Sequence, residues 1–337
     1  MVITQSLRFS FLLATLISCG PAKDMPQFYT EELSPVSYTS QLEVLFEKDQ
    51  KVFYLLPLSG SVTKEKILWS GYDWSAQEGG INLRWNEPER SWQNTNSPGW
   101  FEALLMTTEQ LKTLSPSEKY DLLLGQYQYP FKELVSNTPI ENLRKGWILA
   151  TLHHKEPTAK EVRSNEGIKV PFGSSDIKAL LSFYYAHNFK LMKVKEIGGA
   201  NNELDAGTFH AVLGNSIGLK NSSFLMGNLP VKSYASRIEE ELGAIEGAPQ
   251  GTIKTIKIRA RVVSISPTTE NSWEGILETP AQKTIAGEYS YYLYLNQDNE
   301  ILKGKWLSPE RPIKIWVAEK NKDFLPPLEH LGKLLDD

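Results

Sequence analysis

The side chains best suited to nucleophilic or metal chemistry are few in this sequence. Cys19 is the only cysteine among 337 residues, which also include five histidines. A single thiol excludes an internal disulfide framework, a zinc ribbon and any cysteine nucleophile after position 19. The adjacent His153 and His154 could suggest metal binding. Neighbouring residues on a strand point to opposite faces, so we expect solvated or capping roles for them.

Two short matches to the S-x-x-K pattern of acyl-serine enzymes occur, Ser61 with Lys64 and Ser175 with Lys178. We interpret both as chance matches, because Ser and Lys are common and the second pair lies at a predicted helix start. The sequence contains no phosphate loop, dinucleotide fingerprint, nucleophile elbow or zinc-protease pattern. We therefore expect neither a metal nor a cofactor.

The residues before Cys19 predict a secretory signal peptide. Arg8 precedes an apolar run at residues 9–17, which is too short for a membrane-spanning helix of about 20 residues. Residues 16–20, Leu-Ile-Ser-Cys-Gly, resemble the lipobox of bacterial lipoproteins, which implies acylation of the cysteine and removal of residues 1–18. The alternative is an ordinary signal peptide with a cysteine there by chance. The glycine after the cysteine resembles outer-membrane sorting, so we expect a lipid-anchored protein on the periplasmic or surface face.

Composition places the rest of the chain among soluble proteins with an ordinary core. Lys and Arg number 36 against 40 Asp and Glu, a net charge of -4, and hydrophobic residues make up 41%. Nucleic-acid binding needs a basic stripe, so this mild acidity argues against a nucleic-acid partner. No later segment approaches the length of an apolar membrane span.

Helix signals gather in the middle of the chain. Residues 107–110 have the spacing of a capping box, and Ser-Pro-Ser-Glu at residues 115–118 begins a second helix. The clearest helix follows residues 171–173, where Asp176 suits the first turn and apolar residues recur with helical spacing. These apolar residues are Ile177, Leu180, Leu181 and Tyr184.

Strand patterns lie on both sides of these helices. Residues 52–56 form a short apolar run that ends at a proline, which is typical of a buried strand, and residues 209–217 are apolar and β-like. From Thr252 the period of polarity changes to two, and residues 289–295 with a turn at 297–299 predict a hairpin. We interpret the basic face of the first of these strands as solvated; it consists of Lys254, Lys257, Arg259 and Arg261.

These patterns predict an α+β protein in four parts. Residues 1–18 form the signal peptide, 19–49 the lipidated N-terminus and tether, 50–246 a mixed core, and 247–337 a β-rich C-terminal part. Five of the nine tryptophans lie in residues 69–100. Core packing is the expected use of these large rings, and a sugar-binding platform is the alternative.

The motifs, taken in order, resemble the elicitor-type transglutaminases of plant pathogens and bacterial relatives. The most specific match is Ser-Ser-Asp-Ile-Lys-Ala-Leu at residues 174–180, and the resemblance covers about residues 55–316. It implies a papain/transglutaminase-like core followed by a β-rich part. Other matching segments are residues 69–71, 80–85, 115–123, Gly146-Trp147, Gly198-Gly199, Phe209-His210, Pro230-Val231 and 292–306.

In such enzymes a cysteine thiolate attacks a glutamine amide, ammonia leaves, and an amine captures the thioester. The resemblance implies a nucleophile two residues before the Gly-Trp pair, and Arg144 stands there. A guanidinium stays protonated and cannot attack an acyl carbon. The second cysteine that the family has after Gly198-Gly199 is also missing. The histidine is kept, because His210 matches the catalytic-histidine strand, and Asn228 stands near the position of the orienting acid.

Two functions follow from this pattern. The first is a cell-envelope lipoprotein that keeps the scaffold without the thiol chemistry and binds peptides, amines or envelope components, with the membrane as a partner through Cys19. The second is an active protein-glutamine γ-glutamyltransferase with an unrecognised nucleophile, in which His210 is the base and Asn228 or Asp205 orients it. His210 itself is either a relict or repurposed base or a packed strand histidine.

Overall fold

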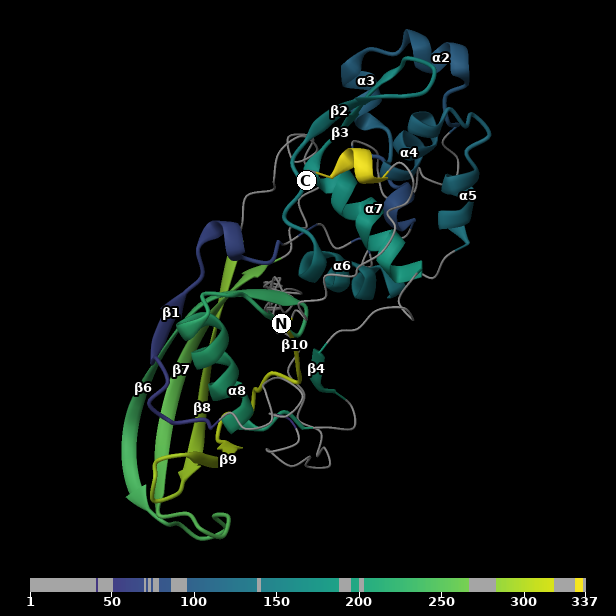
Figure 1. Cartoon of the computed structure of the whole chain (residues 1–337). Helices are drawn as coiled ribbons and strands as arrows, with labels where there is room; N and C mark the ends of the chain where they lie inside the picture. The colour runs from purple at the N-terminus through teal and green to yellow at the C-terminus, as the bar shows by residue number, and fades with distance from the viewer. Residues whose placement is uncertain are drawn as a thin grey trace, which may run out of the picture.

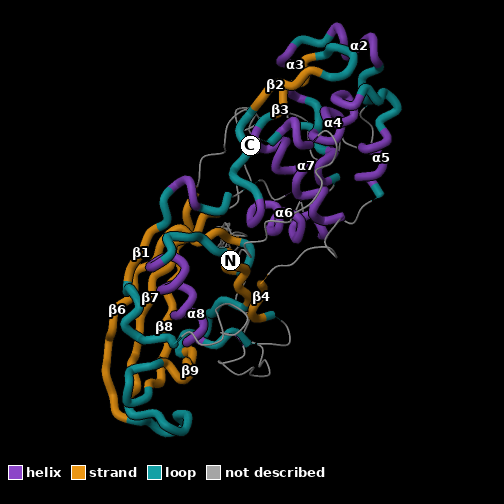
Figure 2. Tube along the Cα trace, in the orientation of Figure 1, coloured by secondary structure: helices purple, strands orange, loops and turns teal. Residues whose placement is uncertain are grey.

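The computed structural model has two lobes, one helical and one built around a large antiparallel sheet (Figures 1 and 2). This arrangement confirms the predicted α+β class. The helical lobe comprises described residues within 68–187 and 331–335, and the sheet lobe those within 51–67 and 195–317. The structure describes residues 41, 51–69, 71, 74, 79–85, 96–137, 141–187, 195–199, 203–266, 283–317 and 331–335.

The helical lobe surrounds a core rich in leucine and aromatic side chains, and three of its tryptophans, Trp69, Trp74 and Trp85, are buried there. This bears out the core-packing interpretation for those three. Trp100 is instead exposed, and Trp92 lies outside the described residues. The elements are η3 (Gly80–Asn82), α2 (Trp100–Leu105), α3 (Thr108–Thr113), α4 (Pro116–Leu124), α5 (Pro130–Ser136), α6 (Glu141–His153), β2 (Lys160–Arg163), β3 (Lys169–Phe172), α7 (Ser174–His187) and η7 (Leu331–Leu334).

The predicted helix starts are confirmed. Thr107 and Ser115 each cap a helix, α3 and α4, and each forms both hydrogen bonds of a capping box with the residue three positions later. The helix α7 carries the predicted apolar residues into the core, except for the half-buried Tyr184. α7 also explains Gly146 of α6, because a Cβ there would collide with the backbone of Ser182 and Ala186. The glycine of the Gly-Trp pair is therefore required for close helix packing.

The sheet lobe is dominated by three long antiparallel strands, β6, β7 and β8, whose inner face is covered by α8 (Figure 1). The strand order is β4-β10-β5-β6-β7-β8-β9, with β1 paired to β6. The elements are β1 (Ser59–Ser61), η1 (Lys64–Lys66), β4 (Lys195–Gly198), α8 (Ala206–Val212), the π-helical turn η5 (Leu213–Leu219), β5 (Leu225–Met226), β6 (Leu229–Gly243), β7 (Lys254–Ser266), β8 (Lys283–Leu295), β9 (Ile301–Trp306) and β10 (Lys314–Val317).

The period-two predictions are confirmed in this lobe. Along β7, Ile256, Ile258, Ala260 and Val262 are buried in its core. The basic residues of that strand are partly or fully exposed. Lys254, Lys257 and Arg259 pair with glutamates of the neighbouring strands, Glu239, Glu241 and Glu288. The predicted hairpin joins β8 to β9, and Asn299 takes a left-handed conformation (φ 63°) in its turn.

Three secondary-structure predictions were wrong. Residues 52–56 form a turn with a single bridge, Phe53 to Glu300, in place of a strand. Residues 209–217 are helical, in α8 and η5; every residue from 204 to 217 is buried, so the segment shows no polar face that would reveal a helix. His153 and His154 lie at the end of α6, not on a strand.

Some predictions concern residues that the structure does not describe, or a domain boundary that it does not test. Residues 1–18, and 19–49 apart from Gln41, lie outside the described residues. The expected boundary at residue 246 falls in the turn between the paired strands β6 and β7, and it stays a prediction. Within the described ranges, no helix is both long and apolar enough to cross a membrane.

Candidate functional site

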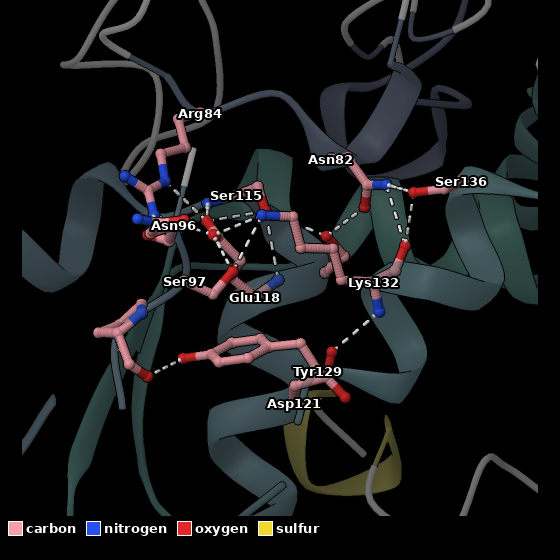
Figure 3. Close-up of polar contacts among 12 residues, drawn as sticks. Asn82, Arg84, Asn96, Ser97, Ser115, Glu118, Asp121, Tyr129, Lys132 and Ser136 are labelled. Atoms are coloured by element: carbon pink, nitrogen blue, oxygen red, sulfur yellow. Dashed lines mark hydrogen bonds and ion pairs between the residues drawn. The ribbon is translucent and has the colours of Figure 1, made fainter. Parts of the chain in front are cut away.

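The Ser-Pro-Ser-Glu motif forms the centre of a buried ionic cluster in the helical lobe (Figure 3). The side chain of Glu118 is 0% exposed and accepts two hydrogen bonds from Arg84, at 2.8 and 2.9 Å. The ammonium of Lys132 lies 2.9 Å from the same carboxylate. Ser97 and Ser115 complete its shell with hydroxyl donors at 2.6 and 3.2 Å. We call these five residues the Glu118 cluster.

The charges in this cluster compensate one another. Burial alone would raise the pKa of Glu118, but the hydrogen bonds from Arg84 and the positive charges of Lys132 and Arg84 lower it to about 2. A carboxylate held so firmly ionised, with its partners around it, is unsuited to proton transfer near neutral pH. The cluster therefore joins loop 96–97, the segment at residues 82–85 and helices α4 and α5.

A second buried pair links α4 to α7. Lys119 and Asp176 are both 0% exposed, and the ammonium lies 2.6 Å from the carboxylate. The indole of Trp85 and the backbone N–H of Gly173 also donate to Asp176, at 2.9 and 2.8 Å. Thus Asp176, in the Ser-Ser-Asp-Ile-Lys-Ala-Leu segment, fixes the start of α7, and the most specific motif of the resemblance is structural.

Arg144 occupies the fourth position of α6, in the helical lobe, and its side chain is partly buried. Leu143 before it is buried and Lys145 after it is exposed. None of these three side chains is a nucleophile at neutral pH. The sequence carries no cysteine after position 19, so no thiol can stand at this helix.

His210 lies on α8, in the core of the sheet lobe, and is 2% exposed. Its Nε2 is 3.1 Å from the carbonyl oxygen of Tyr54, and its Nδ1 is 3.0 Å from the hydroxyl of Tyr291. A carbonyl only accepts, so Nε2 carries the proton and donates to Tyr54, and Nδ1 accepts from the Tyr291 hydroxyl. Burial lowers the pKa of His210 to about 4, against the effect of the Tyr54 carbonyl. Both nitrogens are therefore engaged within the protein.

The sequence-predicted site residues do not form one constellation. Arg144 and His210 lie in different lobes, on α6 and α8 (Figure 1). Asn228 lies in the turn between β5 and β6, whereas His210 is bonded to two tyrosines. Asp205 is the N-cap of α8, and its Oδ1 accepts from three backbone N–H groups. The tyrosine partners were missed, although Tyr291 belongs to the alternating pattern of β8.

The weaker candidates have structural partners. Ser175 and Lys178 lie within α7, and the Lys178 ammonium is 2.5 Å from Glu156. His154 is 2.7 Å from the hydroxyl of Tyr185, and burial, then the neighbouring His153, lowers its pKa to about 4. In the described part of the chain, no three His, Cys, Asp or Glu side chains come together as a metal site would require.

Comparison with known proteins supports the fold. The structure is similar to the crystal structure of the GP42 transglutaminase from Phytophthora sojae, with a TM-score of 0.62 and 18% sequence identity, covering 90% of this chain and 98% of that chain. No family model and no curated protein matches the sequence. At this identity the likeness concerns the fold. The chain therefore has a transglutaminase-like fold, as the resemblance of the motifs predicted.

Proposed function

We propose that this protein is a non-catalytic binding protein on a transglutaminase-like fold, held at the cell envelope by lipid on Cys19. The observation that carries the proposal is the absence of cysteine from residues 20–337. Transfer through a thioester needs a thiolate, and no other side chain at the Arg144 position of α6 supplies a nucleophile.

The surroundings of His210 support the same proposal. A general base needs a free lone pair directed at the proton that it removes. In His210 that lone pair, on Nδ1, accepts from the Tyr291 hydroxyl, and the side chain is buried between α8 and the sheet. Its role is then to tie α8 to β8 and to the segment at Tyr54.

The test is an amine-incorporation assay with the full chain purified in mild detergent. A protein whose glutamine side chains donate the acyl group and a fluorescent primary amine that accepts it are supplied, with and without calcium. We expect no incorporation above that of the His210→Gln variant. We also expect Arg144→Cys to remain inactive, since His210 lies in the other lobe. Incorporation that disappears in His210→Gln would favour the alternative, an active γ-glutamyltransferase with an unrecognised nucleophile.

The envelope location is tested separately. We propose that residues 1–18 are removed and that Cys19 is acylated, with an outer-membrane position on the periplasmic or surface face. Expression in a bacterial host with an alkyne-labelled fatty acid should label the protein and not its Cys19→Ser variant. A chain that carries no label in either form would contradict the anchor and leave the fold-based proposal unaffected.

A further inference from the structure

A pocket of about 550 Å³ lies beside the edge strand β9, where α8 begins. Its size falls within the roughly 300–1,000 Å³ of pockets that bind small ligands or short segments. Four separate stretches of chain line it: residues 203–205 before α8, the β6–β7 turn at Gly247 and Pro249, Tyr294 of β8, and residues 303–306 of β9 with Arg311.

One wall of the pocket is held rigidly. The amide side chain of Gln41 donates to the carbonyl of Glu203 at 2.6 Å and accepts from the N–H of Asp205 at 3.0 Å. The indole of Trp306 donates to the carbonyl of Leu204 at 2.7 Å. The polar groups of residues 203–205 are thus fixed from two sides, which lowers the conformational entropy that the protein would lose when a ligand binds.

Asp205 joins this wall to β9. Its Oδ1 accepts from the backbone N–H of Gly207 at 2.8 Å and from that of Gly304 at 2.9 Å. Its Oδ2 accepts no hydrogen bond from any described residue, and Asp205 lines the pocket. The second oxygen is therefore available to accept a hydrogen bond from an N–H group.

The charged residues that line the pocket carry an excess of positive charge: three cations, Lys303, Lys305 and Arg311, against Glu203 and Asp205. Lys303 and Lys305 line it on β9, both are exposed, and neither forms an ion pair with any residue that the structure describes. Arg311 is paired with Glu203. Lys303 also acts electrostatically on the Asp205 carboxylate. The lining therefore keeps one net positive charge, so the pocket favours an anionic ligand.

The spacing of these lysines limits the shape of that ligand. They stand opposite Tyr294 and Tyr292 in the β8–β9 register, on one face of the strand. Alternate residues of an extended chain advance roughly 6–7 Å, so the two ammonium groups match two acidic side chains placed two residues apart in an extended peptide. A polypeptide also supplies backbone N–H groups, which suit Asp205 Oδ2.

We propose that this pocket binds an extended acidic segment of a partner protein, with two carboxylates on Lys303 and Lys305 and a backbone N–H on Asp205. The inference deepens the proposed binding role and rests on it. The two can fail separately, because the amine-incorporation assay examines catalysis and the following assay examines peptide binding.

The experiment uses the full chain in mild detergent and fluorescein-labelled nonapeptides with blocked ends, followed by fluorescence polarisation. One peptide carries Glu at alternate positions in a Thr/Val background, and the matched peptide carries Gln there. We expect the Glu peptide to bind at least about tenfold more tightly, with an affinity that falls as salt rises. Equal binding of the two peptides would overturn the proposal.

The variant is Lys303→Glu with Lys305→Glu, and the matched control is Lys64→Glu with Lys66→Glu. The control pair has the same spacing, is exposed and lies on η1, away from the pocket. We expect the pocket variant to lose at least about tenfold in affinity and the control to lose little. Equal losses would reveal non-specific attraction and overturn the proposal, as would binding of a carboxylated polysaccharide in place of the peptide.

Discussion

The two lobes differ in where their main ion pairs lie, buried in the helical lobe and exposed to solvent in the sheet lobe. In the helical lobe, Glu118, Lys119 and Asp176 have side chains that are 0% exposed and surrounded by partners. In the sheet lobe, Glu239 pairs with Lys257 and Arg259, whose side chains are 33% and 46% exposed. The same kinds of ion pair therefore act as internal connections in one lobe and as a solvated surface in the other.

This difference explains which residues make up the motifs of the resemblance. The most specific motifs, at residues 115–121 and 174–180, supply the buried charges of the helical lobe. A buried charge without its partner is costly, so such positions tolerate little change even where catalysis is absent. A match at these two motifs therefore predicts the fold, and by itself it carries no information on whether the chemistry remains.

The largest expected effect is that of Glu118→Gln. The substitution leaves Arg84 and Lys132, 13% and 14% exposed, without the carboxylate that compensates them. We expect a loss of about 3–5 kcal/mol in the free energy of unfolding of the helical lobe. Urea unfolding, with hydrogen exchange of the α4 amides, measures it. Glu109→Gln, in a surface pair with Lys112, is the matched control, and equal losses in both would contradict the comparison.

Acid should separate the contribution of His210 from that of Glu118. The pKa of His210, about 4, lies below its ordinary 6.5, so its contribution to stability is full above pH 6.5 and is lost as the pH falls toward 4, about 3 kcal/mol in all. The pKa of Glu118 is about 2 against 4.5, so its contribution is lost only as the pH falls from 4.5 toward 2. Burial raises the pKa of Asp121, in the helical lobe, and of Asp205, in the sheet lobe, to about 6. Each carboxyl adds stability at low pH that is lost as the pH rises from 3.8 to 6. The stability of the two lobes therefore changes in the same direction through these groups.

We therefore expect hydrogen-exchange protection of β8 to decrease between pH 6.5 and 4, before Glu118 takes up a proton. His154, whose pKa is also lowered to about 4, weakens the helical lobe over the same range. His210→Gln keeps a side-chain donor for the Tyr54 carbonyl and removes the titration. Its unfolding free energy should change less with pH than that of the native chain between pH 6.5 and 4. Parallel curves would show that His210 does not titrate as its burial requires.

A double-mutant cycle sharpens the account of the buried pair. Lys119→Met leaves the Asp176 carboxylate without its cation, and Asp176→Asn leaves the ammonium buried without an anion. The double variant removes both charges, so we expect it to be more stable than the sum of the single losses predicts, by about 2 kcal/mol. Strictly additive losses would mean that the two side chains do not interact energetically.

Local signals predicted much of the fold. The capping boxes at Thr107 and Ser115, the helix after residue 173 and the alternation of β7 depend on neighbours within a few positions, so the sequence displays them directly. The strand prediction for residues 209–217 was wrong because the segment is buried on every side and so has no periodic polar face. Its tight helical start depends on Asp205, which was considered only as an orienting acid.

The site could be predicted only in part, because its contacts are distant in sequence. Arg84 reaches Glu118 across 34 positions, and Tyr291 reaches His210 across 81. No local pattern indicates such partners. The lysine pair of β9 was visible as Lys-Gly-Lys, but the wall that faces it comes from residues about 100 positions earlier, with Asp205 bonded to Gly304 across 99.

The smallest expected effect lies on the outer face of the sheet. Glu239 is exposed to solvent and pairs with Lys257, Arg237 and Arg259 at 3.3, 3.4 and 3.5 Å, so water and salt screen the attraction. We expect Glu239→Gln to leave the urea midpoint of the sheet lobe unchanged at physiological salt. The measurement is the same unfolding curve at low and high salt. Both glutamates pair with more than one cation, but their side chains differ in exposure, 21% against 0%. A loss as large as that of Glu118→Gln would therefore mean that burial does not distinguish the two lobes.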